Sequence, residues 1–165
     1  MPEDLDALIR SLGQKHYFEE RLDRQLHGSG ILLVAWKHGE PLGDVYLWLE
    51  RAEEPELTTH LPDAALLTHL EVLPAHRNEG IGSELMGVAE ERLFSMGYKR
   101  VALGVGLDNR DAQRLYERRG YDEWPHGYVT TTRVEYQPDG RRELSAEMCR
   151  IMVKQLGSDH YEHRW

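Results

Sequence analysis

Features that tie a protein to an oxidising compartment or a membrane are nearly absent from this sequence. Its 165 residues include one cysteine, Cys149, so no internal disulfide can form, which fits a reducing cytoplasm. The sequence has no run of about 18 apolar residues and therefore predicts no transmembrane helix. Residues 1–4 are acidic overall and do not resemble a signal peptide. We expect a cytoplasmic protein without a membrane partner.

Positive charge is also scarce. The chain has 20 lysine and arginine residues against 29 aspartate and glutamate residues, which gives a formal net charge of -9. Because proteins bind nucleic acids through a basic surface, we expect no nucleic-acid partner. An acidic surface favours cationic or amine ligands, but acidity that serves only solubility explains the composition equally well.

The sequence lacks internal repeats and long low-complexity linkers. Its length suits one domain with a sizeable core, and we place that domain at residues 1–157. Residues 158–165 form a polar tail that we expect to be frayed. His160 and His163 have a spacing compatible with metal binding, but a pair in a polar tail is a weak signal. We expect no metal site.

Residues 77–82, Arg-Asn-Glu-Gly-Ile-Gly, are the most informative stretch that is present. They follow an apolar run at 66–73 and precede a helical pattern at 83–96. Glycine lets the backbone turn sharply and approach a ligand closely. The first amides of a helix have no partner within the helix and, together with the helix dipole, attract an anion. With the charge of Arg77, this arrangement predicts a phosphate-binding loop.

Two common phosphate loops do not fit these residues. A nucleoside-triphosphate loop needs lysine and then serine or threonine after its last glycine, but Gly82 is followed by Ser83 and Glu84. A dinucleotide-binding loop needs a third glycine, and that position is Leu85. The Gly-Val-Gly at 104–106 fails in the same way. The pattern that remains is Arg-x-x-Gly-x-Gly.

A second motif lies at 108–121, where the sequence reads Asn-x-x-Ala-x-x-Leu-Tyr-x-x-x-Gly-Tyr from its second residue onward. Together with the first motif, and with strand-like segments at 70–74 and 101–105, it resembles the GNAT acetyltransferases. The close similarity covers residues 66–121. The flanking segments match this family only in general layout.

The pattern of expected elements is that of an α/β protein with the GNAT fold, in which helices flank a mixed central β-sheet. The family usually begins with a strand, whereas here the first strand is absent or very short. We expect a bulge at Gly43 and a long polar loop at 50–63. The expected helices span 4–12, 16–27, 83–96 and 109–119, and the expected strands span 31–36, 41–49, 66–73, 101–105, 129–136 and 147–155.

The resemblance implies that acetyl-coenzyme A is the cosubstrate. Its pyrophosphate would meet the loop formed by Arg77, Asn78, Glu79, Gly80, Ile81, Gly82 and Ser83. Its pantetheine arm would pair with the backbone of Leu70 and Val72, and the Val72 amide would polarise the thioester carbonyl. Asn109 and Ala112 of the second motif would contact the pantetheine region. Asn109 also suits a helix N-cap, and the two roles are compatible.

The resemblance also implies that Tyr116 is the general acid that protonates the departing thiolate. A phenol ordinarily titrates near 10 and a thiol near 8.5, so this transfer is feasible once a thiolate develops. A tyrosine beside Leu115 on a helix also suits a core position, which remains the alternative.

The general base is harder to name. The usual family positions on the preceding strand fall on Leu66 and Thr68, and one on the next strand falls on Gly104. The nearest titratable groups are His69 and Glu71. Strand alternation places two sets on opposite faces: Leu66, Thr68, Leu70 and Val72 on one, and Leu67, His69 and Glu71 on the other. His69 and Glu71 therefore reach the substrate only if a bulge shifts the register.

These residues predict an N-acetyltransferase that transfers an acetyl group directly to a primary amine in a ternary complex. Cys149 reads as a buried structural thiol and not as a nucleophile. The acceptor is a small-molecule amine or a peptide or protein amine. A non-catalytic module that senses acyl-coenzyme A, and an enzyme that uses a longer acyl chain, remain alternatives. Aromatic residues that suit an acceptor pocket, the core or a homodimer interface are Trp36, Tyr46, Trp48, Trp124 and Tyr128.

Overall fold

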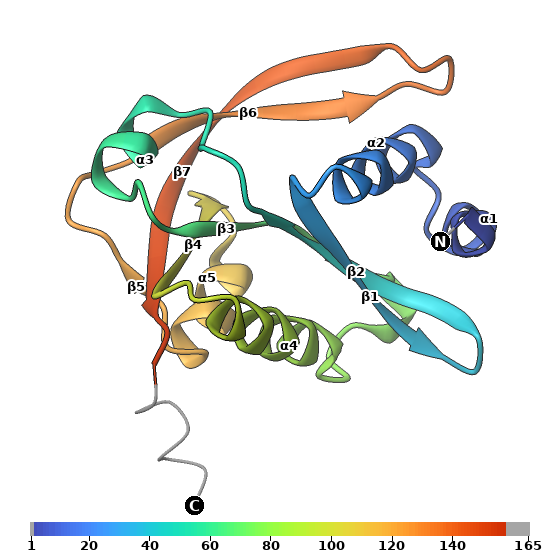
Figure 1. Cartoon of the computed structure of the whole chain (residues 1–165), viewed down its shortest axis with the longest axis horizontal. Coiled ribbons are helices and arrows are strands. Elements are labelled where there is room, and N and C mark those ends of the chain that lie inside the picture. The colour runs from blue at the N-terminus through green and yellow to red at the C-terminus, as the bar shows by residue number, and fades with distance from the viewer. Residues whose placement is uncertain (1, 158–165) are drawn as a thin grey trace, which may run out of the picture.

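A computed structural model describes residues 2–157 and contains one seven-stranded sheet with helices on both faces (Figure 1). In chain order the elements are α1 (Pro2–Leu12), α2 (Lys15–Leu26), β1 (Gly30–Lys37), β2 (Glu40–Trp48), α3 (Pro55–His60), β3 (Ala65–Val72), the 3₁₀ helix η1 (Pro74–His76), α4 (Ile81–Ser95), β4 (Arg100–Gly106), α5 (Arg110–Arg118), β5 (Asp122–Glu123), β6 (Val129–Tyr136) and β7 (Arg142–Gln155).

The strands follow the order β1-β2-β3-β4-β7, and both β5 and β6 pair with β7. All neighbours are antiparallel except β3 and β4, which run parallel. Their pairing is limited to Ala65 with Val101 and Leu66 with Ala102. Beyond these pairs no register joins β3 to β4 in residues 2–157, so the sheet opens there.

Each face of the sheet has its own core. The α4 side buries Val45 and Leu47 of β2 in one cluster, and the α1–α2 side buries Tyr46 and Trp48 of the same strand in another. Alternating side chains of β2 are therefore covered on both faces, which explains why the strand reads as almost continuously apolar. Figure 1 shows α1 and α2 on one side of the sheet and α4 and α5 on the other.

The predicted α/β class, with helices flanking a mixed central sheet, is confirmed, and three local predictions are wrong. The predicted loop at 50–63 contains α3, which begins at Pro55 and buries Leu57 on the sheet. A short strand, β5, follows α5 where none was expected. The last strand begins at residue 142, not at 147, because it pairs with the whole of β6 across the turn.

The bulge predicted at Gly43 lies one residue earlier. Ala35 pairs with Gly43 and Trp36 pairs with Pro41, which leaves Leu42 as the extra residue of β2. Gly43 has a different role, because a Cβ there would lie 2.7 Å from the Glu71 carbonyl oxygen of β3. Glycine is required by this close approach of two backbones.

The first described element is a helix, as the sequence predicts. Within residues 2–157 the first element is α1, and no strand precedes it. In the same range no helix is both long and apolar enough to cross a bilayer. The tail predicted at 158–165, with His160 and His163, lies outside the described residues.

Candidate active site

A cleft of about 720 Å³ lies at the opening between β3 and β4. On the α4–α5 side it is lined by Met86 and Tyr116, and on the α2 side by Tyr17 and Trp48. The β6–β7 hairpin extends toward α2 (Figure 1), where the ring of Tyr136 stacks on the ring of His16 at 6.4 Å between centroids. The cleft is thus lined from both faces of the sheet.

The predicted phosphate loop lies between η1 and α4. Asn78 and Gly80 both adopt left-handed backbone conformations, with φ of 67° and 84°. Gly80 is the N-cap residue of α4, and no described side chain caps this helix start. The first amides of α4, at residues 81–83, are therefore left for solvent or an anion. Arg77 is exposed, and its Nε donates to the Val72 carbonyl at 3.2 Å.

The edge of β3 that faces β4 continues the loop into the cleft. Beyond Leu66 this edge has no strand partner in the described part of the chain, and it includes Leu70 and Val72. An unpaired strand edge accepts an extended group as an added strand. The residues predicted to bind pantetheine therefore lie on a backbone edge that can do so.

The second motif forms α5 and its N-cap. The Asn109 Oδ1 accepts a hydrogen bond from the Ala112 amide at 3.2 Å, so the predicted capping role is confirmed. Tyr116 lies on the same helix, packs against the core and lines the cleft. Burial raises the pKa of the Tyr116 phenol above its ordinary value. The phenol is therefore protonated at neutral pH and has a proton to donate.

A bulge in β3 decides which side chains reach the acceptor side of the cleft. Thr68 pairs with Tyr46 and Glu71 pairs with Asp44, so two residues of β3 oppose the single residue between those partners. His69 occupies the bulge with a left-handed φ of 57°. A non-glycine residue in this region is strained and is held there by its surroundings.

The bulge corrects the predicted alternation. The core cluster under α4 contains Leu67, and Leu70 and Val72 pack against it. Leu66, by contrast, packs against two clusters on the other face. Leu70 and Val72 therefore do not share a face with Leu66, as strict alternation required. The sequence predicts that His69 and Glu71 reach the substrate only if a bulge shifts the register, and β3 contains such a bulge.

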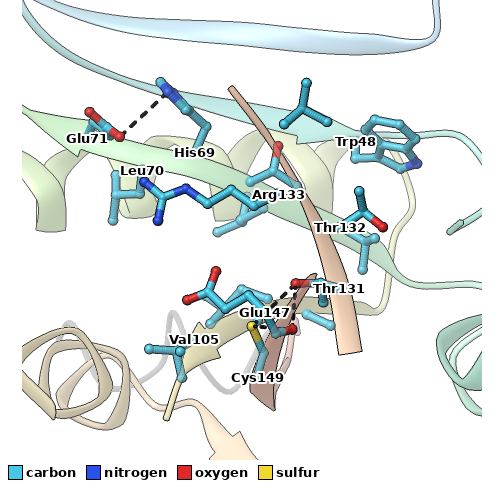
Figure 2. Close-up of a pocket in the computed structure, with 18 of the residues that line it drawn as sticks. Trp48, His69, Leu70, Glu71, Val105, Thr131, Thr132, Arg133, Glu147 and Cys149 are labelled. Carbon is cyan, nitrogen blue, oxygen red and sulfur yellow. Dashed lines mark hydrogen bonds and ion pairs between the residues drawn. The ribbon is translucent and has the colours of Figure 1, made fainter. Parts of the chain in front are cut away.

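His69 makes close contacts on three sides. Its Nδ1 lies 2.9 Å from Asp44 Oδ1, and its Nε2 lies 3.2 Å from Gln14 Oε1. Its ring stacks on Tyr17 with 4.0 Å between centroids. Glu71 lies farther away, with its Oε1 3.7 Å from His69 Nε2, and is about half exposed (Figure 2). Both predicted bases are near one another, but only His69 is held by a buried partner.

Sequence reasoning missed Asp44. Its side chain is 2% exposed, and burial raises its pKa while the hydrogen bond and charge of His69 oppose that rise. A carboxylate within the apolar strand β2 was the available signal, because a buried charge is retained where a partner compensates it. His69 lies 25 residues away along the chain, so no short motif connects them.

Cys149 is buried on β7, as predicted, but it also lines the cleft. Burial raises the pKa of its thiol, the hydrogen bond between this thiol and Thr131 opposes the rise, and the charges of Glu147 and Glu54 raise the pKa further. The reactive form of cysteine is the thiolate. A thiol with a raised pKa stays protonated at neutral pH and is a poor nucleophile.

Most of the aromatic residues considered for an acceptor pocket lie outside the cleft. Trp48 lines the cleft, and Tyr46 is buried in the α1–α2 core. Trp36 and Tyr128 are exposed, and Trp124 packs against α3 and β7 in a third cluster. Among the described residues, no group of three or more histidine, cysteine, aspartate or glutamate side chains is arranged to hold a metal ion.

The sequence model of the family described as "Acetyltransferase (GNAT) family" matches residues 3–121. The chain belongs to the GNAT acetyltransferase family. A [ribosomal protein bS18]-alanine N-acetyltransferase of Haemophilus ducreyi is 31% identical over 126 residues, which are 71% of this chain and 83% of that protein. An aminoalkylphosphonate N-acetyltransferase of Salmonella typhimurium is 31% identical over 93 residues, 54% of this chain and 55% of that protein.

The solved structures of this family share the fold. The PaiA N-acetyltransferase of Thermoplasma acidophilum, solved in complex with coenzyme A, superimposes with a TM-score of 0.59 and 19% identity over 94% of this chain and 79% of that one. The family match ends at residue 121. The β6–β7 hairpin, which lines the cleft beside α2, lies beyond it.

Proposed function

We propose that this GNAT protein is an acetyl-coenzyme A-dependent N-acetyltransferase that moves the acetyl group directly to a primary amine. The observation that carries the proposal is the cleft at the opening between β3 and β4. The cofactor loop lies beside the α4 end of this opening, and the His69–Asp44 pair lies on the other face of the sheet. A donor and an acceptor that enter from opposite faces would meet there, which suits a ternary complex.

The donor side is assigned to main chain. The amides of residues 81–83 bind the pyrophosphate, and the charge of Arg77 assists them. The edge of β3 at Leu70 and Val72 binds the pantetheine arm. The Val72 amide donates to the thioester oxygen and stabilises the negative charge that develops on it during transfer. The helix start without a side-chain cap and the unpaired strand edge support these assignments.

On the acceptor side, His69 takes the proton from the amine. Asp44 accepts a hydrogen bond from the Nδ1–H of His69 and fixes the orientation of its ring, as the carboxylate does in other histidine–carboxylate pairs. Glu71 is the alternative base, but it is more exposed and has no comparable buried partner among its contacts in residues 2–157.

Tyr116 donates a proton to the coenzyme A thiolate as it departs. Its burial keeps the phenol protonated until that charge develops. Cys149 is the one thiol of the chain, and its raised pKa argues against a covalent acetyl intermediate. These two properties support direct transfer between two bound substrates.

The acceptor is a small-molecule amine or an amine of a peptide or protein. The two relatives described above are named for an alanine of a ribosomal protein and for aminoalkylphosphonates. The test is release of free thiol from acetyl-coenzyme A with an alanine-terminated peptide, a lysine peptide, spermidine and 3-aminopropylphosphonate. We expect turnover with at least one amine. Cofactor binding without turnover would indicate a sensing module, and faster release from a longer acyl chain would reassign the donor.

Tyr116→Phe tests the general acid. Loss of a general acid costs about 10²- to 10⁴-fold in rate, so kcat should fall within that range. The affinity for coenzyme A, measured by calorimetry, should stay within about twofold, because the hydroxyl is a small part of the contact. Tyr98→Phe, in a residue that packs on the same core and does not line the cleft, is the control. An unchanged kcat for Tyr116→Phe rejects the role.

A further inference from the structure

Glycines at the end of β4 leave room for a carboxylate from the next strand. A Cβ on Gly106 would lie 2.5 Å from Glu147 Oε1. A Cβ on Gly104 would lie 3.5 Å from the Cβ of Cys149. The space above this end of β4 is therefore occupied by side chains of β7. The Glu147 carboxylate can lie over β4 only because residue 106 has no side chain.

The carboxylate of Glu147 points into the cleft between β3 and β4. Figure 2 shows it in the space bounded by Leu70 and Val105. The strand that carries it is held in place, since Thr131 Oγ1 donates to the Glu147 carbonyl at 3.3 Å. The residue is partly buried, and partial exclusion of water strengthens any ionic contact it makes.

Glu147 has no ion-pair partner within 4.0 Å among the described residues. The two arginines that line the cleft have carboxylates of their own. Arg133 Nε lies 3.3 Å from Glu135 Oε1, and an Arg21 terminal nitrogen lies 3.1 Å from Glu20 Oε1. Five glutamates line the same cleft. The cleft therefore offers a cation an unpaired carboxylate in a negative surrounding field.

We propose that Glu147 binds the ammonium group of the acceptor before its deprotonation and that it selects amines with no anionic group nearby. This rests on the proposed acetyl transfer and adds the acceptor class, a cationic amine. An ammonium donates hydrogen bonds that a carboxylate accepts, and such charge-assisted bonds are stronger than neutral ones. A phosphonate or carboxylate on the acceptor would be repelled by the same residue.

The test measures binding apart from turnover. Propylammonium and 3-aminopropylphosphonate are titrated separately by NMR into the protein saturated with coenzyme A. The wild type should bind propylammonium more tightly. Glu147→Gln should weaken propylammonium by roughly tenfold, since a charge-assisted hydrogen bond is lost, and should bring the two affinities together. With an amine substrate from the panel, KM should rise by a similar factor while kcat stays within about threefold.

Two further variants test whether Glu147 binds the ammonium group at a specific position or acts only through its negative charge. Glu143→Gln removes the same charge four residues away on the same strand, at an exposed position that does not line the cleft, and should change neither affinity. Gly106→Ala keeps the charge but displaces the carboxylate, and should weaken propylammonium as Glu147→Gln does. Since a flexible side chain can shift at little cost, this variant should still fold.

The outcomes are distinguishable. Unchanged propylammonium affinity in Glu147→Gln overturns the inference, and so does an equal loss in Glu143→Gln. If Glu147→Gln kept the propylammonium affinity but lowered kcat, Glu147 would act as a proton acceptor instead, and this result also overturns the inference. An ammonium site without thiol release from any amine would leave the binding inference standing and reject the proposed function.

Discussion

At the scale of single residues, Asp44 is a buried acid in a strand that is otherwise apolar. Removing a carboxylate from water is costly unless a partner compensates it. Here the compensation comes from His69, whose ring lies between Asp44 and the cleft. We therefore assign Asp44 a positioning role: it acts on the acceptor through His69 and does not touch it.

Asp44→Asn should lower kcat by at least about tenfold, because an amide no longer fixes the Nδ1 proton or balances a positive charge on His69. Cofactor affinity should hold, since the predicted cofactor loop leads into α4, which covers the opposite face of the sheet from His69 and Tyr17. The decisive measurement is a double-mutant cycle on kcat with His69→Gln. If Asp44 works through His69, the double variant should be no slower than His69→Gln alone. Independent, multiplying losses would show a structural role instead.

The same residues show which parts of the candidate site could be predicted from the sequence. His69 and Glu71 could be named as candidates because titratable groups on that strand are few. Asp44 could not be joined to them, since the pairing depends on the register between β2 and β3. Register is a long-range property, set by packing on both faces of β2 and by the close approach at Gly43.

At the scale of elements, the two sequence motifs predicted local structure more accurately than the alternation of side chains along β3 did. The glycine turn that precedes a helix at 77–82 and the cap at Asn109 were predicted correctly because each feature is local: the glycines and the side chain act within a few residues. Alternation along β3 failed because it holds only for an unbroken strand. The His69 bulge leaves no mark in the sequence of β3 that would distinguish it from continuous strand.

Gly80 provides an element-scale test, because its φ of 84° and the open space beside it both bear on the cofactor. Gly80→Val should abolish measurable coenzyme A binding in calorimetry, since the new side chain strains the turn and occupies the approach to the α4 amides. The matched control is Gly97→Val at the other end of α4. Gly97 has a φ of 96°, and a Cβ at this position would meet nothing within 4 Å, so the backbone strain is comparable.

Gly97→Val should lower stability but keep cofactor affinity within about twofold, because it lies away from the loop. If both variants lost the cofactor equally, strain on α4 would explain the loss, and the loop would have no special role. If Gly80→Val bound coenzyme A normally, the phosphate assignment to residues 81–83 would be rejected.

At the scale of the whole molecule, the two sides of the cleft differ in how they could be predicted. The proposed donor side lies within 66–121, where both motifs are found, and the family match covers this segment as part of residues 3–121. The proposed acceptor side is assembled from α2, β2, β3 and the β6–β7 hairpin, which meet only in the folded chain. Contacts such as the stack of His16 on Tyr136 join segments 120 residues apart and have no local signal.

The elements around the donor side are joined by one buried carboxylate. Glu90 of α4 is 2% exposed and accepts hydrogen bonds from Tyr121 Oη at 2.8 Å, from Arg119 at 2.9 Å and from Lys154 Nζ of β7 at 2.9 Å. These partners lie just after α5 and on β7. Glu90 therefore connects the helix of the cofactor loop to the helix of Tyr116 and to the strand of Glu147.

Glu90→Gln should lower the free energy of unfolding by about 3 kcal/mol, because it removes the negative charge that faces the nearly buried ammonium of Lys154. Urea unfolding followed by tryptophan fluorescence measures this, with m-values compared to exclude a change in the denatured state. Glu91→Gln, at the exposed neighbouring position, should cost no more than about 0.5 kcal/mol. If Glu90→Gln lowered the free energy of unfolding no more than Glu91→Gln does, apolar packing alone would hold α4, α5 and β7 together. The geometry of the cleft would then not depend on the Glu90 carboxylate.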